Sequence, residues 1–142
     1  MKTGEIELLE HMIKSCEMGI EGINSILKKV KDKALRDELM HEIQEYQLIH
    51  TEAERMLAQR GEAPKGIGVV AKVSSELVTE MQTAFDDSTS KLADMMIKGT
   101  TMGVTKSLKL LNSYEGDEQV KDLCVRLRTL EENRISKLKE YL

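Results

Sequence analysis

The chain has 142 residues and a formal net charge of −4, and it contains one proline, nine glycines, no tryptophan and only 3% aromatic residues. This composition disfavours β-sandwiches and barrels, which need many turn-forming residues and more aromatic side chains. A single proline instead indicates long, uninterrupted helices. The acidic balance argues against a partner that is a nucleic acid or an anionic membrane. The length fits a single domain over residues 1–142.

Two further features concern the location of the protein. No segment approaches the ~18 apolar residues of a membrane span, and residues 1–10 carry three glutamates where a signal peptide would have an apolar core. We therefore expect a cytoplasmic protein. Cys16 and Cys124 lie far apart on apolar helical stripes, and we expect both to be buried free thiols.

The first predicted helix, over residues 4–31, has apolar residues spaced alternately by three and four positions, which places them on one helical face. This seam comprises Ile6, Leu9, Ile13, Cys16, Ile20, Ile23, Leu27 and Val30. A second amphipathic helix is predicted over residues 33–60, and Gly61 is expected to end it in a left-handed conformation. The short connection between the two helices predicts an antiparallel hairpin.

Residues 61–68 (GEAPKGIG) contain the only proline and form the one expected linker. A shorter amphipathic helix is predicted over 70–85, followed by two long helices over 88–114 and 117–141. The sequence leaves open whether 70–85 is a separate crossover helix or the bent start of the next one. Two short hairpins and one long connection favour an all-α fold, a ferritin-like antiparallel four-helix bundle with an additional short crossover helix.

The middle of such a bundle is where a metal site would lie. A di-iron carboxylate bundle needs a glutamate on each of two helices and Glu-x-x-His on each of the other two. We estimated the register of the helices from the positions of the turns. At the middle level, the four helices are expected to present Glu17, the pair Gln47 and His50, residues 99–102, and the pair Glu131 and Arg134.

Several of these residues depart from the metal-binding pattern. Gln47 replaces an acid, residues 99–102 contain no acid, and Arg134 cannot ligate iron because its guanidinium stays protonated and has no acceptor. Arg134 could instead replace the metal charge and pair with Glu131 or Glu17. The sequence also allows Arg134 to extend along the seam edge to water.

The third long helix carries two glycines one turn apart, Gly99 and Gly103. Glycine destabilises a helix interior relative to alanine, so we expect a neighbouring backbone or a bulky side chain to approach closely there. A small-ligand pocket between helices, lined by these glycines and nearby methionines, is a further possibility.

Three segments carry a resemblance to known proteins: residues 17–23 (EMGIEGI), 60–64 (RGEAP) and 98–103 (KGTTMG). With them, the chain resembles the ferritin-like superfamily and, more narrowly, a family of uncharacterised bacterial four-helix proteins. In metal-binding relatives of the superfamily, the ligands are acids and histidines at mid-bundle. The resemblance therefore implies a degenerate di-metal site, in which only Glu17, His50 and Glu131 match by type and level.

Two hypotheses about function follow. The first is a non-enzymatic ferritin-like bundle that acts as a binding or structural module, has no cofactor and forms a homo-oligomer, with a dimer favoured. The second is a ferritin-like protein that binds iron or another divalent metal through Glu17, His50 and Glu131. His50 as a hydrogen-bonded core histidine and Glu17 as a solvated flank residue are the corresponding structural alternatives.

Overall fold

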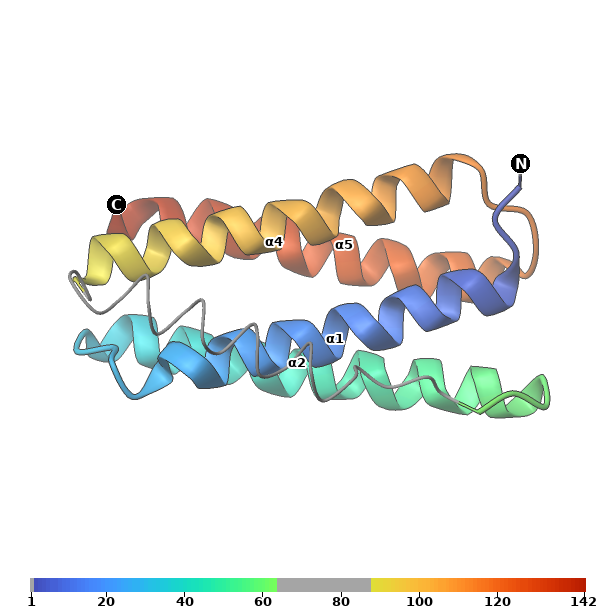
Figure 1. The fold of residues 1–142 in the computed structure, drawn as a ribbon, viewed down its shortest axis with the longest axis horizontal. Helices are drawn as coiled ribbons and strands as arrows, with labels where there is room; N and C mark the ends of the chain where they lie inside the picture. Colours follow the sequence, from blue (N-terminus) through green and yellow to red (C-terminus); the bar gives the residue numbers. More distant parts are fainter. Residues whose placement is uncertain (1, 64–87) are drawn as a thin grey trace.

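A computed structural model describes residues 2–63 and 88–142 of the chain. Most of these residues belong to four long helices, whose axes lie side by side along the long axis of the molecule (Figure 1). They are α1 (Glu5–Leu27), α2 (Lys33–Gln59), α4 (Thr89–Asn112) and α5 (Glu118–Leu138), and the 3-10 helix η1 (Lys139–Tyr141) follows α5. The described ranges contain no strand, so the predicted all-α, four-helix architecture is confirmed. The helix predicted over 70–85 lies outside the described residues.

Capping side chains fix where three of the helices begin. Asp32 accepts a hydrogen bond from the Leu35 amide at the start of α2, and Asp117 accepts one from the Gln119 amide at the start of α5. At the start of α4, the Ser88 hydroxyl accepts a hydrogen bond from the Lys91 amide. Such caps satisfy amide groups that have no partner within the helix.

The end of α2 has the expected left-handed glycine. Gly61 has a φ of 75°, and the Glu62 amide donates to the Leu57 carbonyl at 3.2 Å. This pattern is a Schellman motif, which satisfies carbonyls at a helix end. By contrast, α1 ends at Leu27, before residue 31 where the apolar seam predicted its end. Val30 is nevertheless buried, and its carbonyl accepts a hydrogen bond from Arg36.

One end of the bundle is joined by contacts between distant segments. The Arg60 Nε donates to the Glu5 Oε1 at 2.8 Å, and the Glu5 Oε2 accepts from the Asp117 amide at 2.6 Å. The Thr3 amide donates to the Ser113 carbonyl at 2.8 Å. These bonds join the start of α1 to the end of α2 and to the connection between α4 and α5.

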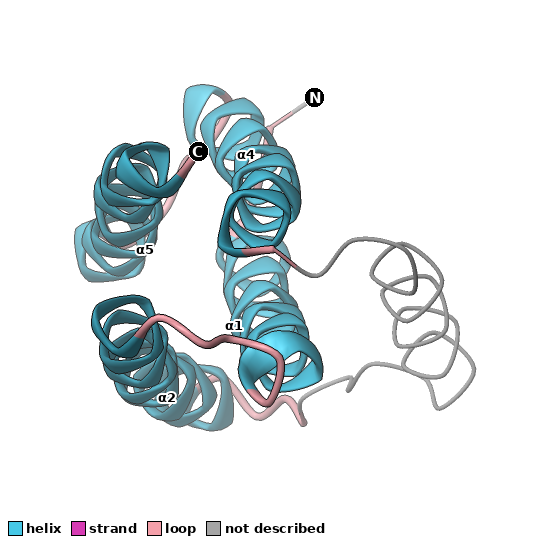
Figure 2. Ribbon diagram, turned by 90° about the vertical axis from the view of Figure 1, so that its left-hand side faces the viewer, coloured by secondary structure: helices cyan, strands magenta, loops and turns pink. Residues whose placement is uncertain are grey.

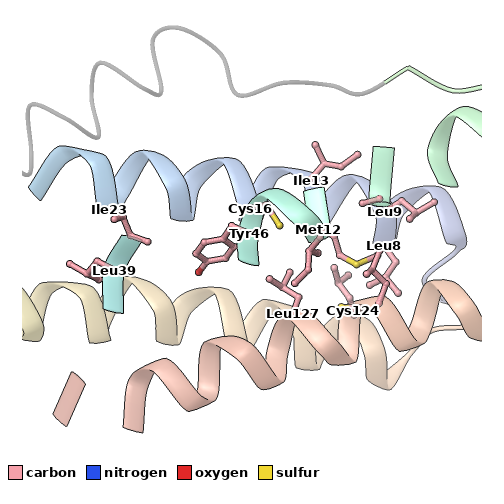
Figure 3. Close-up of a cluster of buried hydrophobic side chains, with 14 of the residues drawn as sticks. Leu8, Leu9, Met12, Ile13, Cys16, Ile23, Leu39, Tyr46, Cys124 and Leu127 are labelled. Atoms are coloured by element: carbon pink, nitrogen blue, oxygen red, sulfur yellow. The ribbon is translucent and has the colours of Figure 1, made fainter. Parts of the chain in front are cut away.

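The helices surround a shared apolar core. Seen along the bundle, α1 lies beside both α2 and α4 (Figure 2). Of the first helix's predicted seam, Ile6, Ile20 and Leu27 are half-buried against this core and the other five residues are buried. Cys16 and Cys124 are buried and free, as expected. Figure 3 shows both among the core side chains. None of the helices in the described part of the chain is long and apolar enough to cross a membrane.

Candidate functional site

A buried polar network lies at the middle of the bundle. The Arg134 Nη2 on α5 donates to the Tyr46 hydroxyl on α2 at 2.7 Å and to the Thr100 hydroxyl on α4. The Tyr46 hydroxyl donates in turn to the Glu131 Oε2 at 2.8 Å. The guanidinium carbon of Arg134 lies 5.0 Å from the centre of the Tyr46 ring, close enough for a cation–π interaction. The network therefore connects three helices.

The local sequence explains how these side chains converge. Glu131 and Arg134 are three residues apart on α5, so they share one helical face, and the Arg134 Nη2 lies 4.0 Å from the Glu131 Oε2. Tyr46 lies in the apolar cluster of the core (Figure 3), and its ring places the hydroxyl inside the bundle. Arg134 is only 2% exposed, so it does not extend along the seam to water.

Two glycines make room for the network. A Cβ on Gly19 would lie 2.5 Å from the Tyr46 ring, and a Cβ on Gly103 would lie 3.3 Å from the Glu131 Oε2. The close approach expected at Gly103 is therefore present, and a carboxylate makes it. No such approach is made to Gly99 by the residues that the structure describes, since an added Cβ would meet none of their atoms within 4 Å.

The network contains buried polar atoms that are not satisfied. The Nε and Nη1 of Arg134 and the Oε1 of Glu131 have no hydrogen-bond partner among the described residues. Burial raises the pKa of Glu131, although the hydrogen bond from Tyr46 and the charge of Arg134 act against this. Because unsatisfied buried polar atoms are uncommon and costly, these atoms identify a part of the core that is not optimised for stability alone.

Glu42 is a buried acid that the sequence reasoning did not single out. It lies one turn before Tyr46 on α2, is 3% exposed, and its Oε2 has no hydrogen-bond partner in the described structure. Burial raises its pKa to about 7, and the charge of Arg134 is the main opposing influence. The available signal was its position four residues from Tyr46, which places both on the same helical face.

The proposed metal ligands fall into two separate groups. The Glu17 Oε1 and the His50 Nε2 are 3.0 Å apart on α1 and α2, and the His50 Nδ1 lies 2.8 Å from the Glu54 Oε1. Glu131 belongs instead to the network of Tyr46 and Arg134. Within residues 2–63 and 88–142, no group of three or more histidine, cysteine, aspartate or glutamate side chains could hold a metal ion.

Gln47 does not take the position that the estimated register gave it. Its side chain is exposed on α2, while the preceding residue, Tyr46, points into the core. Successive residues of an α-helix are about 100° apart around the axis, because there are 3.6 residues per turn. An error of one residue in the register is therefore enough to exchange an inward position for an outward one.

A cavity of about 620 Å³ lies between α1 and α4. The buried network forms its polar part through Tyr46, Thr100, Glu131 and Arg134, while four methionines provide apolar wall: Met18, Met95, Met96 and Met102. His11 also lines the cavity, and its Nε2 lies 2.8 Å from the Ser107 hydroxyl. Burial lowers the pKa of His11 to about 4, so its imidazole is neutral near pH 7.

Comparison with known proteins supports the fold. No family model matches the chain, and no curated protein matches it. A similar solved structure is the crystal structure of a DUF305 fragment from Deinococcus radiodurans, with a TM-score of 0.74. The alignment covers 96% of this chain and 93% of that fragment at 13% sequence identity. At this identity, the likeness concerns the fold alone, and function must be argued from the site.

Proposed function

We propose that the protein is a non-enzymatic, ferritin-like four-helix bundle that acts as a binding or structural module. In this proposal, the Arg134 guanidinium takes the place of the metal ions at the middle of the bundle. The observation that carries it is the burial of Arg134 in contact with Tyr46 and Thr100, beside Glu131. The likeness to the DUF305 fragment supports the helical fold on which the proposal depends.

The chemistry of arginine supports this proposal. A guanidinium is protonated at all physiological pH values and offers only donors, so it cannot ligate a metal ion. A cation bound within a few ångströms of it would be repelled, and the repulsion is strong where little water screens the charges. The Glu131 Oε2 already accepts a hydrogen bond from the Tyr46 hydroxyl. These groups satisfy one another in part without a metal.

We also infer the antiparallel, ferritin-like connectivity. The contact between Arg60 and Glu5 supports opposite directions for α1 and α2, because it joins the end of one to the start of the other. The end of α2 and the start of α4 lie at opposite ends of the bundle (Figure 1). This separation supports a long crossover connection between two helical hairpins, as in ferritin-like folds.

Metal analysis tests the proposal directly. The full chain is expressed in medium supplemented with iron, manganese and zinc, and the metal content of the purified protein is measured beside that of His50→Ala. We expect both proteins to contain far less than one metal ion per chain. Stoichiometric metal that disappears in His50→Ala would contradict the proposal.

The short distance between Glu17 and His50 favours a second candidate, a divalent metal ion held by Glu17, His50 and Glu131. For this, Glu131 must leave its hydrogen bond with Tyr46. The candidate requires that Glu131→Gln lowers the metal content as much as His50→Ala does. Metal binding that survives Glu131→Gln would exclude this ligand set.

We further propose that the protein forms a homodimer. Support comes from α2, where the large apolar side chains of Met40 and Leu48 are 49% and 57% exposed. Exposed apolar side chains of this size are common features of protein interfaces when they form a patch. Light scattering of the wild type is expected to give twice the mass of the chain, and Leu48→Glu is expected to give the monomer mass. A monomeric wild type would contradict the proposal.

A further inference from the structure

The cavity between α1 and α4 has the size and wall of a small-molecule site. Its volume of about 620 Å³ lies within the range of roughly 300–1,000 Å³ that is typical of ligand pockets. Met18 and Met102, on opposite sides of it, are 62% and 75% exposed. Methionine side chains are flexible and polarizable, so they adapt to apolar molecules of different shapes.

Glycines keep the cavity open. Gly22 and Gly99 line it from α1 and α4, and a Cβ on either would meet no atom of the described residues within 4 Å. They differ in this respect from Gly19 and Gly103, whose missing side chains are needed by Tyr46 and Glu131. Because glycine is unfavourable inside a helix, its presence at Gly22 and Gly99 is not explained by packing among the described residues. A molecule bound in the cavity would explain the two glycines, because it would occupy the space beside them.

The polar part of the cavity indicates the head group of that molecule. Arg134 and Glu131 both line the cavity, and each is nearly fully buried. The Nε and Nη1 of Arg134 and the Oε1 of Glu131 lack hydrogen-bond partners among the described residues. A guanidinium fork matches the two oxygens of a carboxylate, which it can bind through two parallel hydrogen bonds.

The charges around the cavity fit an acidic ligand. Six ionisable side chains of the lining carry opposite charges, namely Lys14, Lys106 and Arg134 against Glu7, Glu10 and Glu131. Burial raises the pKa of Glu131, which favours its neutral form. The ionised form of Glu131 is thereby disfavoured beside the nearly fully buried positive charge of Arg134, which leaves that charge available to an acidic group.

We propose that this cavity binds a small molecule with an apolar chain and one carboxyl group, a fatty acid by class. The carboxyl group lies against Arg134, and the chain extends along the methionines of α1 and α4. The inference rests on the proposed function as a binding module, because it specifies what the module binds. Metal content does not enter its test, so the two proposals can fail separately.

A fluorescence titration with cis-parinaric acid tests the site. The full-length wild type is expected to bind one molecule per chain with saturation. Gly99→Leu and Gly22→Leu fill the cavity, and each is expected to weaken binding by about tenfold or more. Both variants remain folded, since leucine is a better helix former than glycine, and thermal unfolding verifies this. Thr101→Leu is the matched control, because Thr101 is exposed on α4 and does not line the cavity.

The head group is tested with the methyl ester of the same probe. We expect the acid to bind about tenfold more tightly than the ester, because only the acid offers a carboxylate to Arg134. Equal binding of acid and ester would overturn the assignment of the carboxyl group. Undiminished binding by both leucine variants, or no saturable binding by the wild type, would overturn the site itself.

Discussion

Two arginines lie at different places in the bundle, and their hydrogen-bond partners and exposure to solvent differ. Arg60, at one end, is partly exposed and contacts Glu5, the Met56 carbonyl and Asp117. Arg134, in the middle, is almost fully buried, yet two of its nitrogens have no partner among the described residues. Water can complete the interactions of Arg60, whereas Arg134 is shielded from the outer surface of the bundle. The end of the bundle is therefore built for stability, whereas the middle retains unused hydrogen-bonding capacity.

The largest expected effect comes from removing the buried arginine. Arg134→Ala leaves the buried Tyr46 and Thr100 hydroxyls without their donor and removes the positive charge beside Glu131, and we expect the free energy of unfolding to fall by about 3–5 kcal/mol. The measurement is urea unfolding at pH 7. Arg60→Ala is the matched control and is expected to lose less, because water replaces its guanidinium. Equal losses would show that the two arginines do not differ in the way described.

Glu42, in the same region, is expected to make the stability of the protein depend on pH. Its pKa in the folded protein is about 7, above the ordinary value of a glutamate, so the folded state binds the proton more tightly than the unfolded state. Stability from this group is therefore complete at low pH and is lost as pH rises through about 7. We expect Glu42→Gln to unfold like the wild type at pH 4.5 and to be more stable by ~2 kcal/mol at pH 8. Parallel pH profiles for the two proteins would contradict this.

The smallest effects compare two glycines of α1. Gly19→Ala places a Cβ against the Tyr46 ring and is expected to destabilise the protein by about 1–3 kcal/mol. Gly22→Ala meets no atom of the described residues within 4 Å and is expected to stabilise the protein by about 0.5–1 kcal/mol, the ordinary gain of alanine in a helix. Thermal unfolding of both variants measures the difference. A loss at Gly22 equal to that at Gly19 would mean that the space beside Gly22 is filled.

The sequence was sufficient for features that depend on local chemistry. The seam of the first helix indicated its buried face, and Gly61 indicated the end of α2. The burial of Cys16 and Cys124 followed from the same periodicity. These features depend on which residues neighbour one another in the chain, and that information is present in a single sequence.

The arrangement of the site depends on contacts between helices, and the sequence was less informative there. Glu17 and His50 were expected at one level, and they lie 3.0 Å apart. Tyr46 was not among the expected site residues, and its hydroxyl is the centre of the network. The rotation of one helix against another decides such contacts, and one residue of error turns a side chain by about 100°. Gln47 was expected at the middle of the bundle and is exposed, and Glu42 was not singled out.

The bonds between Thr3 and Ser113 have a mechanical consequence. They hold the start of α1 to the end of α4 through the Thr3 amide and through hydroxyl groups 2.7 Å apart. Both helices border the cavity, and Glu7 and Leu110 are the lining residues nearest in sequence to this attachment. The contact between His11 and Ser107 also joins α1 to α4. A molecule that widens the cavity would therefore displace the two helices least near these attachments and most toward Ile26 and Met95.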